Sequence, residues 1–418
     1  MNSLKSDGKW VKKNWYYHED LVKFYKFNIP PHSTVLEIGT EKKIQSRGKF
    51  DYIILSDSIS LVDDVQDVFH KIKDYTRRDT RIIINYQNFL WLPFLNIAEK
   101  LKLKSPSNRV NWLNTDDLRN LLSLEGFEVI KQGRRFLFPL PIPIISNIIN
   151  KYLAPLPIIN NFCLINFIIA RNVQVESAAP SSVSVIVPAR NEKGNIENLV
   201  RRIPKMGKMM EIIFVEGHSN DKTFEEIKRV IKKYKDLHIS VFKQKGYGKA
   251  DAVRMGFSKA YGNILLILDA DLTVPPEDLP KFYEALSKGT GELVNGSRLV
   301  YPMEKEAMRT LNIFGNKFFS VLFSWLLNQH IKDTLCGTKA ISKRNYQKIR
   351  SARKYFGDFD PFGDFDLIFG ASKLNLKIIE IPIRYEARKY GKTNISRLAH
   401  GWLLLKMSLF ALNKIKFI

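Results

Sequence analysis

The chain has 418 residues, 45% of them hydrophobic, so it is long enough for two domains with cores of their own. Its 66 Lys and Arg against 42 Asp and Glu give a formal charge of +24, which indicates an anionic partner: nucleic acid, an acidic membrane surface or a phosphorylated substrate. Two cysteines, Cys163 and Cys336, exclude a disulfide framework and favour a reducing cytoplasm. Residues 1–20 lack the apolar core of a signal peptide.

The first half of the chain alternates predicted strands and helices. Apolar runs predict strands at 34–39, 50–57 and 81–86, and residues 114–133 predict a capped helix that leads into a strand. The runs VLEIG, FDYIILSD and EGFEVI resemble class I S-adenosylmethionine-dependent methyltransferases. However, Gly39 is followed by TEKKIQSRGKF, without the Gly-rich turn that such a pocket needs. We expect a degenerate Rossmann-like methyltransferase fold that does not bind S-adenosylmethionine; the alternative is an active methyltransferase.

Two apolar stretches raise the question of membrane contact. Residues 136–170 carry one charge, Lys151, and are interrupted by prolines and asparagines. They predict a Pro-rich loop at a membrane face followed by a core strand near 162–170; the alternative is a transmembrane helix over 152–170. The stretch 400–418 is flanked by lysines and predicts an interfacial helix, or alternatively a packed terminal helix.

A polar stretch at 176–182 predicts a linker between a first domain over residues 1–175 and a second over 183–418. In the second domain helices alternate with apolar strands, which indicates a parallel α/β sheet. The predicted strands are VSVIVPA, EIIFVEG, HISVF and NILLIL.

The strand NILLIL leads directly into Asp269-Ala270-Asp271. Side chains alternate along a strand, so the two carboxylates are expected on one side, roughly 6.6 Å apart along the chain. Pro275 and Pro276 predict the start of a helix. Two carboxylates at the carboxyl end of a parallel strand favour a divalent metal site, while the simpler alternative is an ordinary turn.

Polar residues also follow the first two strands of this domain. Arg190 and Glu192 come after the first, and Glu216, Ser219 and Asp221 come after the second. Any one of them alone is explained by a turn or a helix cap. Because parallel strands end at one edge of a sheet, together they predict a nucleotide pocket there.

Residues 183–400 resemble family 2 glycosyltransferases of the GT-A fold, in the dolichyl-phosphate mannosyltransferase (polyprenol-phosphate sugar synthase) branch. The motifs that carry the resemblance are SVIVPARNE, IIFVEGHSNDKT, KGYGKADAVRMGF, LLILDADLTVPPEDL, NGSR, DTLCGTKAISK and IIEIPIRYEARKYGKT. The resemblance implies a GDP- or UDP-linked sugar donor, Mg²⁺ or Mn²⁺ at the DAD motif, and a polyprenyl phosphate acceptor.

The resemblance also implies roles for single residues. The metal would be held by Asp269, Asp271 and Thr273, the last standing where the family often has glutamine, and Asp269, Asp271 and Arg388 would serve catalysis. The implied donor-binding residues are Pro188, Arg190, Glu192, Val215, Glu216, Asp269, Ala270, Asp271, Arg388 and Lys392.

The sequence departs from the family pattern in two further places. Gly217 stands where a second acidic residue is frequent. Asn394 stands where a lysine usually closes the loop that begins at Arg388 and Gly391, and Lys392 is the possible substitute.

The acceptor phosphate is assigned by the same resemblance to Arg298 and Arg309. Arg298 follows the strand GELVNG, expected beside the DAD strand, and Arg309 begins an apolar helix expected to rest against the membrane. Asp364 and Asp366 are treated as pocket residues or, equally, as an acidic helix start.

We therefore expect an inverting, metal-dependent transfer of mannose or glucose to dolichyl or undecaprenyl phosphate, by a peripheral protein at the cytoplasmic membrane face. The alternatives are a glycan or glycolipid acceptor, and a bifunctional methyltransferase–glycosyltransferase. The charge alone also permits nucleic-acid binding, but no recognition motif of that kind is present, so nucleic acid is not expected as a partner.

Overall fold

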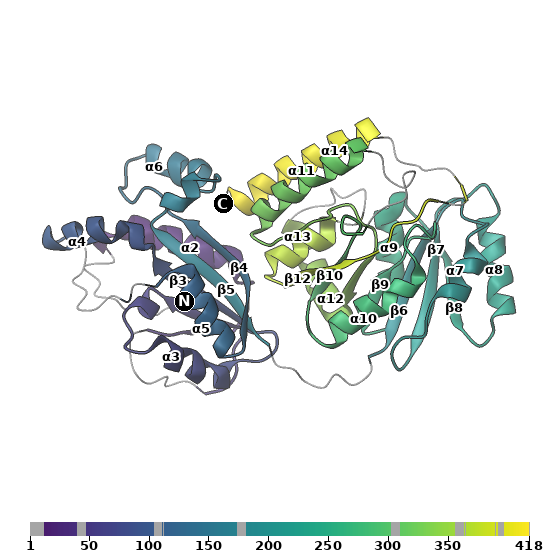
Figure 1. The fold of residues 1–418 in the computed structure, drawn as a ribbon, viewed down its shortest axis with the longest axis horizontal. Coiled ribbons are helices and arrows are strands. Elements are labelled where there is room, and N and C mark those ends of the chain that lie inside the picture. The colour runs from purple at the N-terminus through teal and green to yellow at the C-terminus, as the bar shows by residue number, and fades with distance from the viewer. Residues whose placement is uncertain are drawn as a thin grey trace. The chain divides into compact units, whose positions relative to one another are not determined.

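The structure, a computed structural model, forms two compact units: Met1–Gln174 with Asn413–Ile418, and Val175–Leu412 (Figure 1). Each unit has a sheet and a core of its own. The described residues are 12–39, 47–103, 111, 113–173, 181–301, 310–355, 363, 365–388, 390–391 and 397–417. Most of the predicted linker lies outside them.

The first unit contains a five-stranded sheet in the order β1-β2-β3-β5-β4. Its strands are β1 (Val35–Glu37), β2 (Tyr52–Ser56), β3 (Arg81–Gln87), β4 (Phe127–Arg135) and β5 (Ile165–Asn172). β1, β2 and β3 are parallel, and β5 runs antiparallel to both β3 and β4. The strands predicted at 34–39, 50–57 and 81–86 are confirmed. The apolar runs of β2 and β3 are buried on both faces of the sheet, whereas in β1 only Leu36 is buried.

Helices cover both faces of this sheet. α2 (Trp15–Asn28) places Leu21 and Tyr25 on one face, and α3 (Val65–Ile72) and α5 (Thr115–Leu124) pack on the other. The predicted cap of α5 is confirmed: Asn114 accepts from the backbone N–H groups of Asp116 and Asp117, which satisfies two otherwise unpaired donors. The likeness of this unit to methyltransferases stays a prediction.

The apolar stretch after β4 folds into short turns and then a strand, as the loop interpretation predicts. Its helical pieces are α6 (Ile145–Ile148), a π-turn at Ile149–Leu153 and a 3₁₀ turn at Ile159–Phe162, and β5 follows. Elsewhere in the unit lies α4 (Leu92–Lys100). Within the described part of the chain, no helix combines the length and the apolar character needed to cross a membrane.

The second unit contains a seven-stranded sheet in the order β12-β10-β11-β9-β6-β7-β8. Its strands are β6 (Val183–Ala189), β7 (Met210–Glu216), β8 (His238–Lys243), β9 (Ile264–Ile267), β10 (Leu293–Ser297), β11 (Lys339–Ser342) and β12 (Ile378–Pro382). The parallel arrangement predicted for β6, β7, β8 and β9 is confirmed.

The position predicted for the strand GELVNG is wrong. It forms β10, but β11 lies between it and β9, antiparallel to both. β11 has only four residues and begins with the buried Lys339, so it lacks the apolar run that marks a strand in a sequence. It pairs Ile341 with Leu265 and thereby satisfies the open edge of β9.

Helices form a layer on each face of the seven-stranded sheet. α7, α8 and α10 share one core with the strands, and α9 packs on the opposite face, where a Cβ on Gly256 would lie 2.4 Å from Ile186. α11 and α14 lie side by side (Figure 1). The helices are α7 (Ile196–Arg202), α8 (Thr223–Lys233), α9 (Gly248–Lys259), α10 (Leu279–Ser287), α11 (Thr310–Leu327), α12 (Lys343–Ala352), α13 (Phe365–Lys373) and α14 (Arg397–Ala411).

Candidate active site

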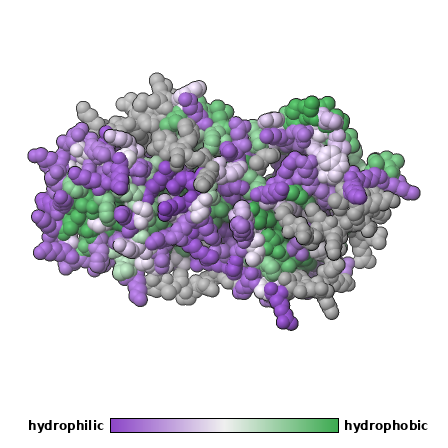
Figure 2. Space-filling view, turned by 180° about the vertical axis from the view of Figure 1, so that it is seen from behind, coloured by the Kyte–Doolittle hydropathy of each residue, from purple (hydrophilic) through white to green (hydrophobic). Residues whose placement is uncertain are grey.

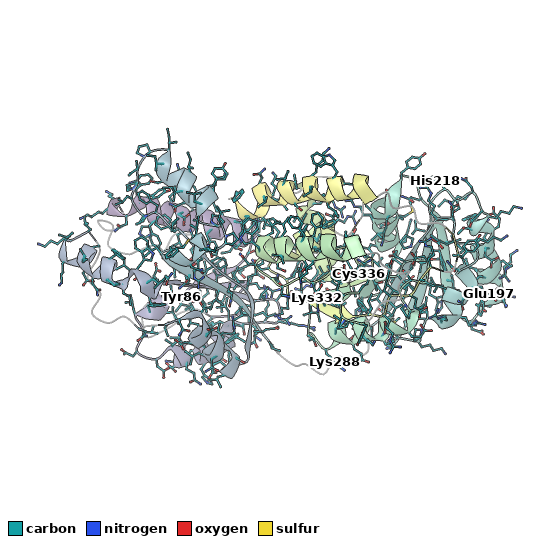
Figure 3. All side chains as sticks on the ribbon, turned by 45° about the horizontal axis from the view of Figure 1, so that its top comes forward. Tyr86, Glu197, His218, Lys288, Lys332 and Cys336 are labelled. Carbon is teal, nitrogen blue, oxygen red and sulfur yellow. The ribbon has the colours of Figure 1, made fainter. Side chains whose placement is uncertain are left out.

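The turns that follow β6 and β7 are bonded to each other. The backbone N–H of Asn191 donates to Ser219 Oγ at 3.0 Å, and that of Lys193 donates to Asp221 Oδ2 at 3.1 Å. In Figure 3, the labelled His218 marks the turn after β7. Ser219 and Asp221, which the sequence presents as simple cap candidates, thus tie the second turn to the first. The two turns form one ordered edge at the carboxyl ends of parallel strands.

Glu192 is held at this edge by three contacts. Its backbone N–H donates to Thr223 Oγ1 at 3.0 Å, its Oε2 accepts from Asn195 Nδ2 at 2.7 Å, and its Oε1 lies 2.7 Å from Arg388 Nη1. The side chain is only 7% exposed. Burial raises the pKa of Glu192, and the positive charge of Arg388 opposes that rise.

Arg388 joins the ends of two strands. Besides Glu192 after β6, its guanidinium contacts Asp271 after β9, with Nη2 2.7 Å from Oδ2. Burial acts to lower the pKa of Arg388, but the charges of Asp271 and Glu192 outweigh it and raise the pKa. A permanently charged group is therefore fixed where the nucleotide pocket is predicted.

The two aspartates of the DAD motif lie beyond their strand. β9 ends at Ile267, so the expected alternation along the strand does not reach Asp269 and Asp271. Each carboxylate instead faces its own cation: Asp271 contacts Arg388, and Asp269 Oδ1 lies 2.6 Å from Lys249 Nζ. The prolines that follow do begin helical structure, with a 3₁₀ turn at Pro276–Asp278 before α10.

Thr273 orients Asp271. Its backbone N–H and its hydroxyl both donate to Asp271 Oδ1, at 3.1 and 2.8 Å. The metal-ligand role predicted for Thr273 remains a prediction, while the structure gives this hydroxyl a positioning contact.

The sequence pattern did not single out Lys249 or Gly337. Lys249 stands in the first turn of α9, and the backbone of Gly337 passes so close that a Cβ there would lie 2.2 Å from both Asp269 Oδ2 and Lys249 Nζ. The only available signals are their places inside the quoted motifs KGYGKADAVRMGF and DTLCGTKAISK. Only glycine at 337 permits the observed position of Asp269.

The donor atoms at this edge suit a hard divalent cation. Asp269 and Asp271 offer carboxylate oxygens, and the described residues contain no group of three or more His, Cys, Asp or Glu that could hold a metal ion. Mg²⁺ is often bound by one or two carboxylates, with substrate phosphates and water completing its shell. The residues present fit such an ion when a diphosphate is bound with it.

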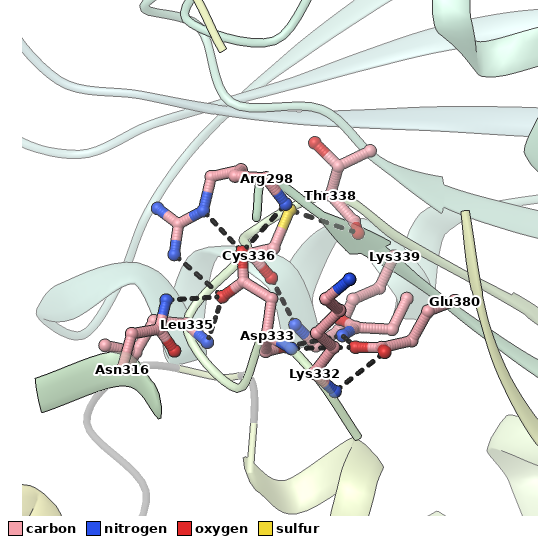
Figure 4. Close-up of polar contacts among 10 residues, drawn as sticks. Arg298, Asn316, Lys332, Asp333, Leu335, Cys336, Thr338, Lys339 and Glu380 are labelled. Carbon is pink, nitrogen blue, oxygen red and sulfur yellow. Dashed lines mark hydrogen bonds and ion pairs between the residues drawn. The ribbon is translucent and has the colours of Figure 1, made fainter. Parts of the chain in front are cut away.

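Arg298 lies in a buried ion pair with Asp333 (Figure 4). Its Nε and Nη2 contact the two carboxylate oxygens at 2.7 and 2.9 Å, and Asn316 Nδ2 donates to the same carboxylate at 3.1 Å. Burial alone would raise the pKa of Asp333, but Arg298 lowers it to about 2. The sequence predicts Arg298 as a phosphate ligand and gives no hint of Asp333, whose only signal is its place in DTLCGTKAISK.

The other predicted donor residues lie on β6 and β7 or close to their ends. Pro188 is paired with Val215 across the two strands, and Glu216 Oε1 accepts from the backbone N–H of Ser219 at 2.5 Å. Arg190 is exposed.

Two further predicted positions are Ala270, between the DAD aspartates, and Gly391, in the loop that begins at Arg388. Ala270 is buried in the core, between Asp269 and Asp271 in the chain. Gly391 has a φ of +78°, and a Cβ there would lie 3.4 Å from Arg388 Nη1. Both fit a tightly packed site.

The acidic pair predicted at 364 and 366 is described only in part. The side chain of Asp366 is 8% exposed and contacts Arg254 and Arg353. Asp364 lies outside the described residues, as do Arg309, Lys392 and Asn394.

Comparison with known proteins finds similarity to glycosyltransferases over the second unit. The profile described as Glycosyl transferase family 2 matches residues 184–350. Dolichol-phosphate mannosyltransferase of Pyrococcus furiosus is 31% identical over 236 residues, 54% of this chain and 64% of that protein. Dolichol-phosphate mannosyltransferase of Saccharomyces cerevisiae is 41% identical over 108 residues, 25% of this chain and 40% of that protein.

A third relative is undecaprenyl-phosphate 4-deoxy-4-formamido-L-arabinose transferase of Pectobacterium atrosepticum, 33% identical over 138 residues, 32% of this chain and 42% of that protein. The chain thus spans less than two thirds of the length of each of these three relatives. Among solved structures, glucosyl-3-phosphoglycerate synthase of Mycobacterium tuberculosis, with Mn²⁺ and uridine diphosphate, matches with a TM-score of 0.41 and 17% identity, over 56% of this chain and 80% of that one.

Proposed function

The chain carries a glycosyltransferase family 2 domain, and from this premise we propose that it transfers mannose or glucose from a GDP- or UDP-linked donor to a polyprenyl phosphate. The observation that carries the proposal is the set of paired charges at the carboxyl ends of β6 and β9. There Glu192, Arg388 and Asp271 form one chain of contacts, and Lys249 holds Asp269 beside it. Cations and carboxylates side by side suit a metal-bound diphosphate.

The residues divide the chemistry among them. Asp269 and Asp271 would hold Mg²⁺ or Mn²⁺, which supplies Lewis-acid neutralisation of the departing diphosphate. Arg388 and Lys249 add fixed positive charge at the same place. A phosphate oxygen of the acceptor forms the new bond to the anomeric carbon while the bond to the nucleotide diphosphate breaks, with inversion. Because that phosphate is already ionised at pH 7, no general base is required.

The acceptor proposal has support from the surface of the second unit. α11 and α14 expose the apolar side chains of Phe318, Val321, Trp402 and Leu409. An exposed apolar helix pair suits a peripheral position on a membrane, where a polyprenyl phosphate lies. We propose that this is the cytoplasmic face, that Arg298 and Arg309 serve the acceptor phosphate, and that the first unit is an accessory without methyltransferase activity.

A donor and acceptor screen tests the function. Full-length protein incubated with GDP-mannose or UDP-glucose, Mg²⁺ or Mn²⁺ and polyprenyl phosphate is expected to yield a polyprenyl-phosphate sugar, identified by mass spectrometry. Excess EDTA should abolish the product and added Mn²⁺ or Mg²⁺ should restore it, because without the cation the two anionic carboxylates would repel the leaving diphosphate. Full activity in EDTA would refute metal dependence. In a parallel reaction with a glycan in place of polyprenyl phosphate, sugar found on the glycan alone would refute the proposed acceptor.

Gly337→Ala is expected to lower kcat/KM by about tenfold to 100-fold, because small displacements of a catalytic group cost rates of this order. The new Cβ would lie 2.2 Å from Asp269 Oδ2, so the carboxylate or the backbone must move. Gly315→Ala in α11 is the matched control, since a Cβ there meets nothing within 4 Å. Steady-state kinetics with a thermal unfolding curve for each variant checks this. Equal kcat/KM for both variants would show that the close approach is unimportant.

A further inference from the structure

The segment between β4 and β5 of the first unit presents apolar side chains to the outside. Figure 2 shows hydrophobic surface over the α6 region, at the upper right of that view. Single exposed apolar residues are ordinary on protein surfaces, but a contiguous group indicates a contact surface. The group consists of Ile144, Ile145, Ile148, Tyr152, Ile158 and Phe162, and we refer to it as the isoleucine surface.

Two copies of one short pattern build this surface. Residues 141–145 read PIPII and residues 155–159 read PLPII. In each copy the isoleucine after the second proline has a positive φ, 66° at Ile144 and 70° at Ile158. This backbone region is strongly disfavoured for β-branched residues, and such outliers concentrate at functional positions. The two side chains are 73% and 77% exposed, so the strained positions are also the outermost ones.

The polar groups of the same segment are bonded inward. Asn150 Oδ1 accepts from the backbone N–H groups of Leu137 and Phe138, both at 2.8 Å, and its Nδ2 donates to the carbonyl of Phe138. Ser146 Oγ accepts from the backbone N–H of Ile142 at 2.8 Å. Backbone groups that would otherwise form hydrogen bonds with water therefore form them with side chains of the same segment.

The second half of the segment is arranged in the same way. Asn160 Nδ2 donates to the carbonyls of Arg134 and Ala154, both at 2.8 Å, and Trp91 Nε1 donates to the carbonyl of Phe162 at 2.7 Å. A segment with internally paired polar groups and outward isoleucines reverses the usual arrangement of a loop in water. It matches the requirement of lipid, where every backbone polar group must find a partner within the protein.

The charges on and beside the isoleucine surface identify the kind of lipid. Residues 136–163 contain no Asp or Glu and one basic residue, Lys151. α4, which exposes Phe94 and Ile97, is joined to the segment through the Trp91 bond, and its Glu99 and Lys100 leave it without net charge, so Lys151 supplies the positive charge. Basic residues beside apolar ones favour anionic headgroups.

We propose that the isoleucine surface inserts into the interface of an anionic lipid bilayer, with Ile144 and Ile158 as its two deepest points. The first unit is then a membrane-binding module in its own right. This inference does not depend on the transfer reaction, and it is tested without nucleotide sugar or polyprenyl phosphate.

Vesicle binding of the full-length protein tests the proposal. The probe is vesicles of phosphatidylcholine with phosphatidylglycerol, and the variant is Ile144→Asn with Ile158→Asn. A thermal unfolding curve checks that the variant is folded. The partition coefficient is expected to fall about 100-fold, because each buried isoleucine contributes a factor of about ten. Leu124→Asn, at an equally apolar and 63% exposed position in α5, is the control and should bind like the wild type.

A labelling experiment locates the contact directly. Both native cysteines are buried, so Ile158→Cys offers a single accessible thiol for an environment-sensitive fluorophore, and Leu124→Cys offers the control. The label at 158 should shift to the blue on vesicles and be quenched by brominated lipid, whereas the label at 124 should not change.

Two results would overturn the proposal. The first is unchanged vesicle binding by the double variant together with an unresponsive label at 158. The second is a dimer, by light scattering, that the double substitution dissociates while vesicle binding persists, because the isoleucine surface would then bind a second copy of the chain.

Discussion

Asp271→Asn is expected to lower kcat by about 10²–10³-fold, the loss seen when one electrostatic group that stabilises a transition state is removed. The substitution keeps the shape of the side chain but removes the charge that Arg388 contacts at 2.7 Å and that would bind the metal. The fold should survive, because the side chain lies in a turn at the sheet edge. Steady-state kinetics and a thermal unfolding curve measure the two effects separately.

Asp278→Asn is the matched control for this substitution. Asp278 ends the 3₁₀ turn that follows the DAD motif, and its partner is the surface residue Lys281. The control should retain wild-type kcat, because surface ion pairs contribute little. If Asp271→Asn keeps more than half of the wild-type kcat, the role assigned to this carboxylate is refuted.

Asp333→Asn should destabilise the second unit by about 3–5 kcal/mol, because breaking a buried ion pair on one side leaves the other charge uncompensated. The Asp333 side chain is fully buried, and its carboxylate accepts three hydrogen bonds from Arg298, one from the backbone N–H and two from the guanidinium. Urea unfolding of wild type and variant measures the difference. Glu284→Gln, which removes an exposed pair with Lys288, is the control and should leave the unfolding curve unchanged.

The ion pair between Asp333 and Arg298 should make the free energy of unfolding fall as the pH is lowered. The pKa of Asp333 is about 2 in the folded protein against an ordinary value of 3.8. A lowered carboxyl pKa contributes stability that is complete above the ordinary value and is lost as the pH falls toward 2. Wild type should therefore lose more stability than Asp333→Asn between pH 5 and pH 2, by roughly the pKa difference times 1.4 kcal/mol. Parallel losses in the two proteins would contradict the pairing.

Local pattern was sufficient for most of the strands and for the edge that carries the site. Strands such as VSVIVPA are buried on both faces, so a continuous apolar run identifies them in the sequence, whichever strands lie beside them in the sheet. β11 could not be predicted in this way, because a four-residue strand that begins with a buried lysine has no continuous apolar run. The contacts of Arg388 with Glu192, and of Arg298 with Asp333, join residues far apart in the chain. The charges of these residues and their spacing in the sequence do not specify which residues pair, because the pairing depends on the order of the strands in the sheet.

The reversed direction of β11 has a consequence for the distance between the Arg298–Asp333 pair and the Asp269 carboxylate. A strand that runs against its neighbours begins where they end, so the residues just before Lys339 are delivered to the ligand-binding edge. Those residues include Asp333, which fixes Arg298, and Gly337, which abuts Asp269. Four peptide links can span at most about 14 Å, so one short tether sets an upper limit on the separation of these two backbone positions. An insertion or deletion between Asp333 and Gly337 would change the maximum distance between the Arg298–Asp333 pair and Asp269. Changes in the outer helices would leave this distance unaltered.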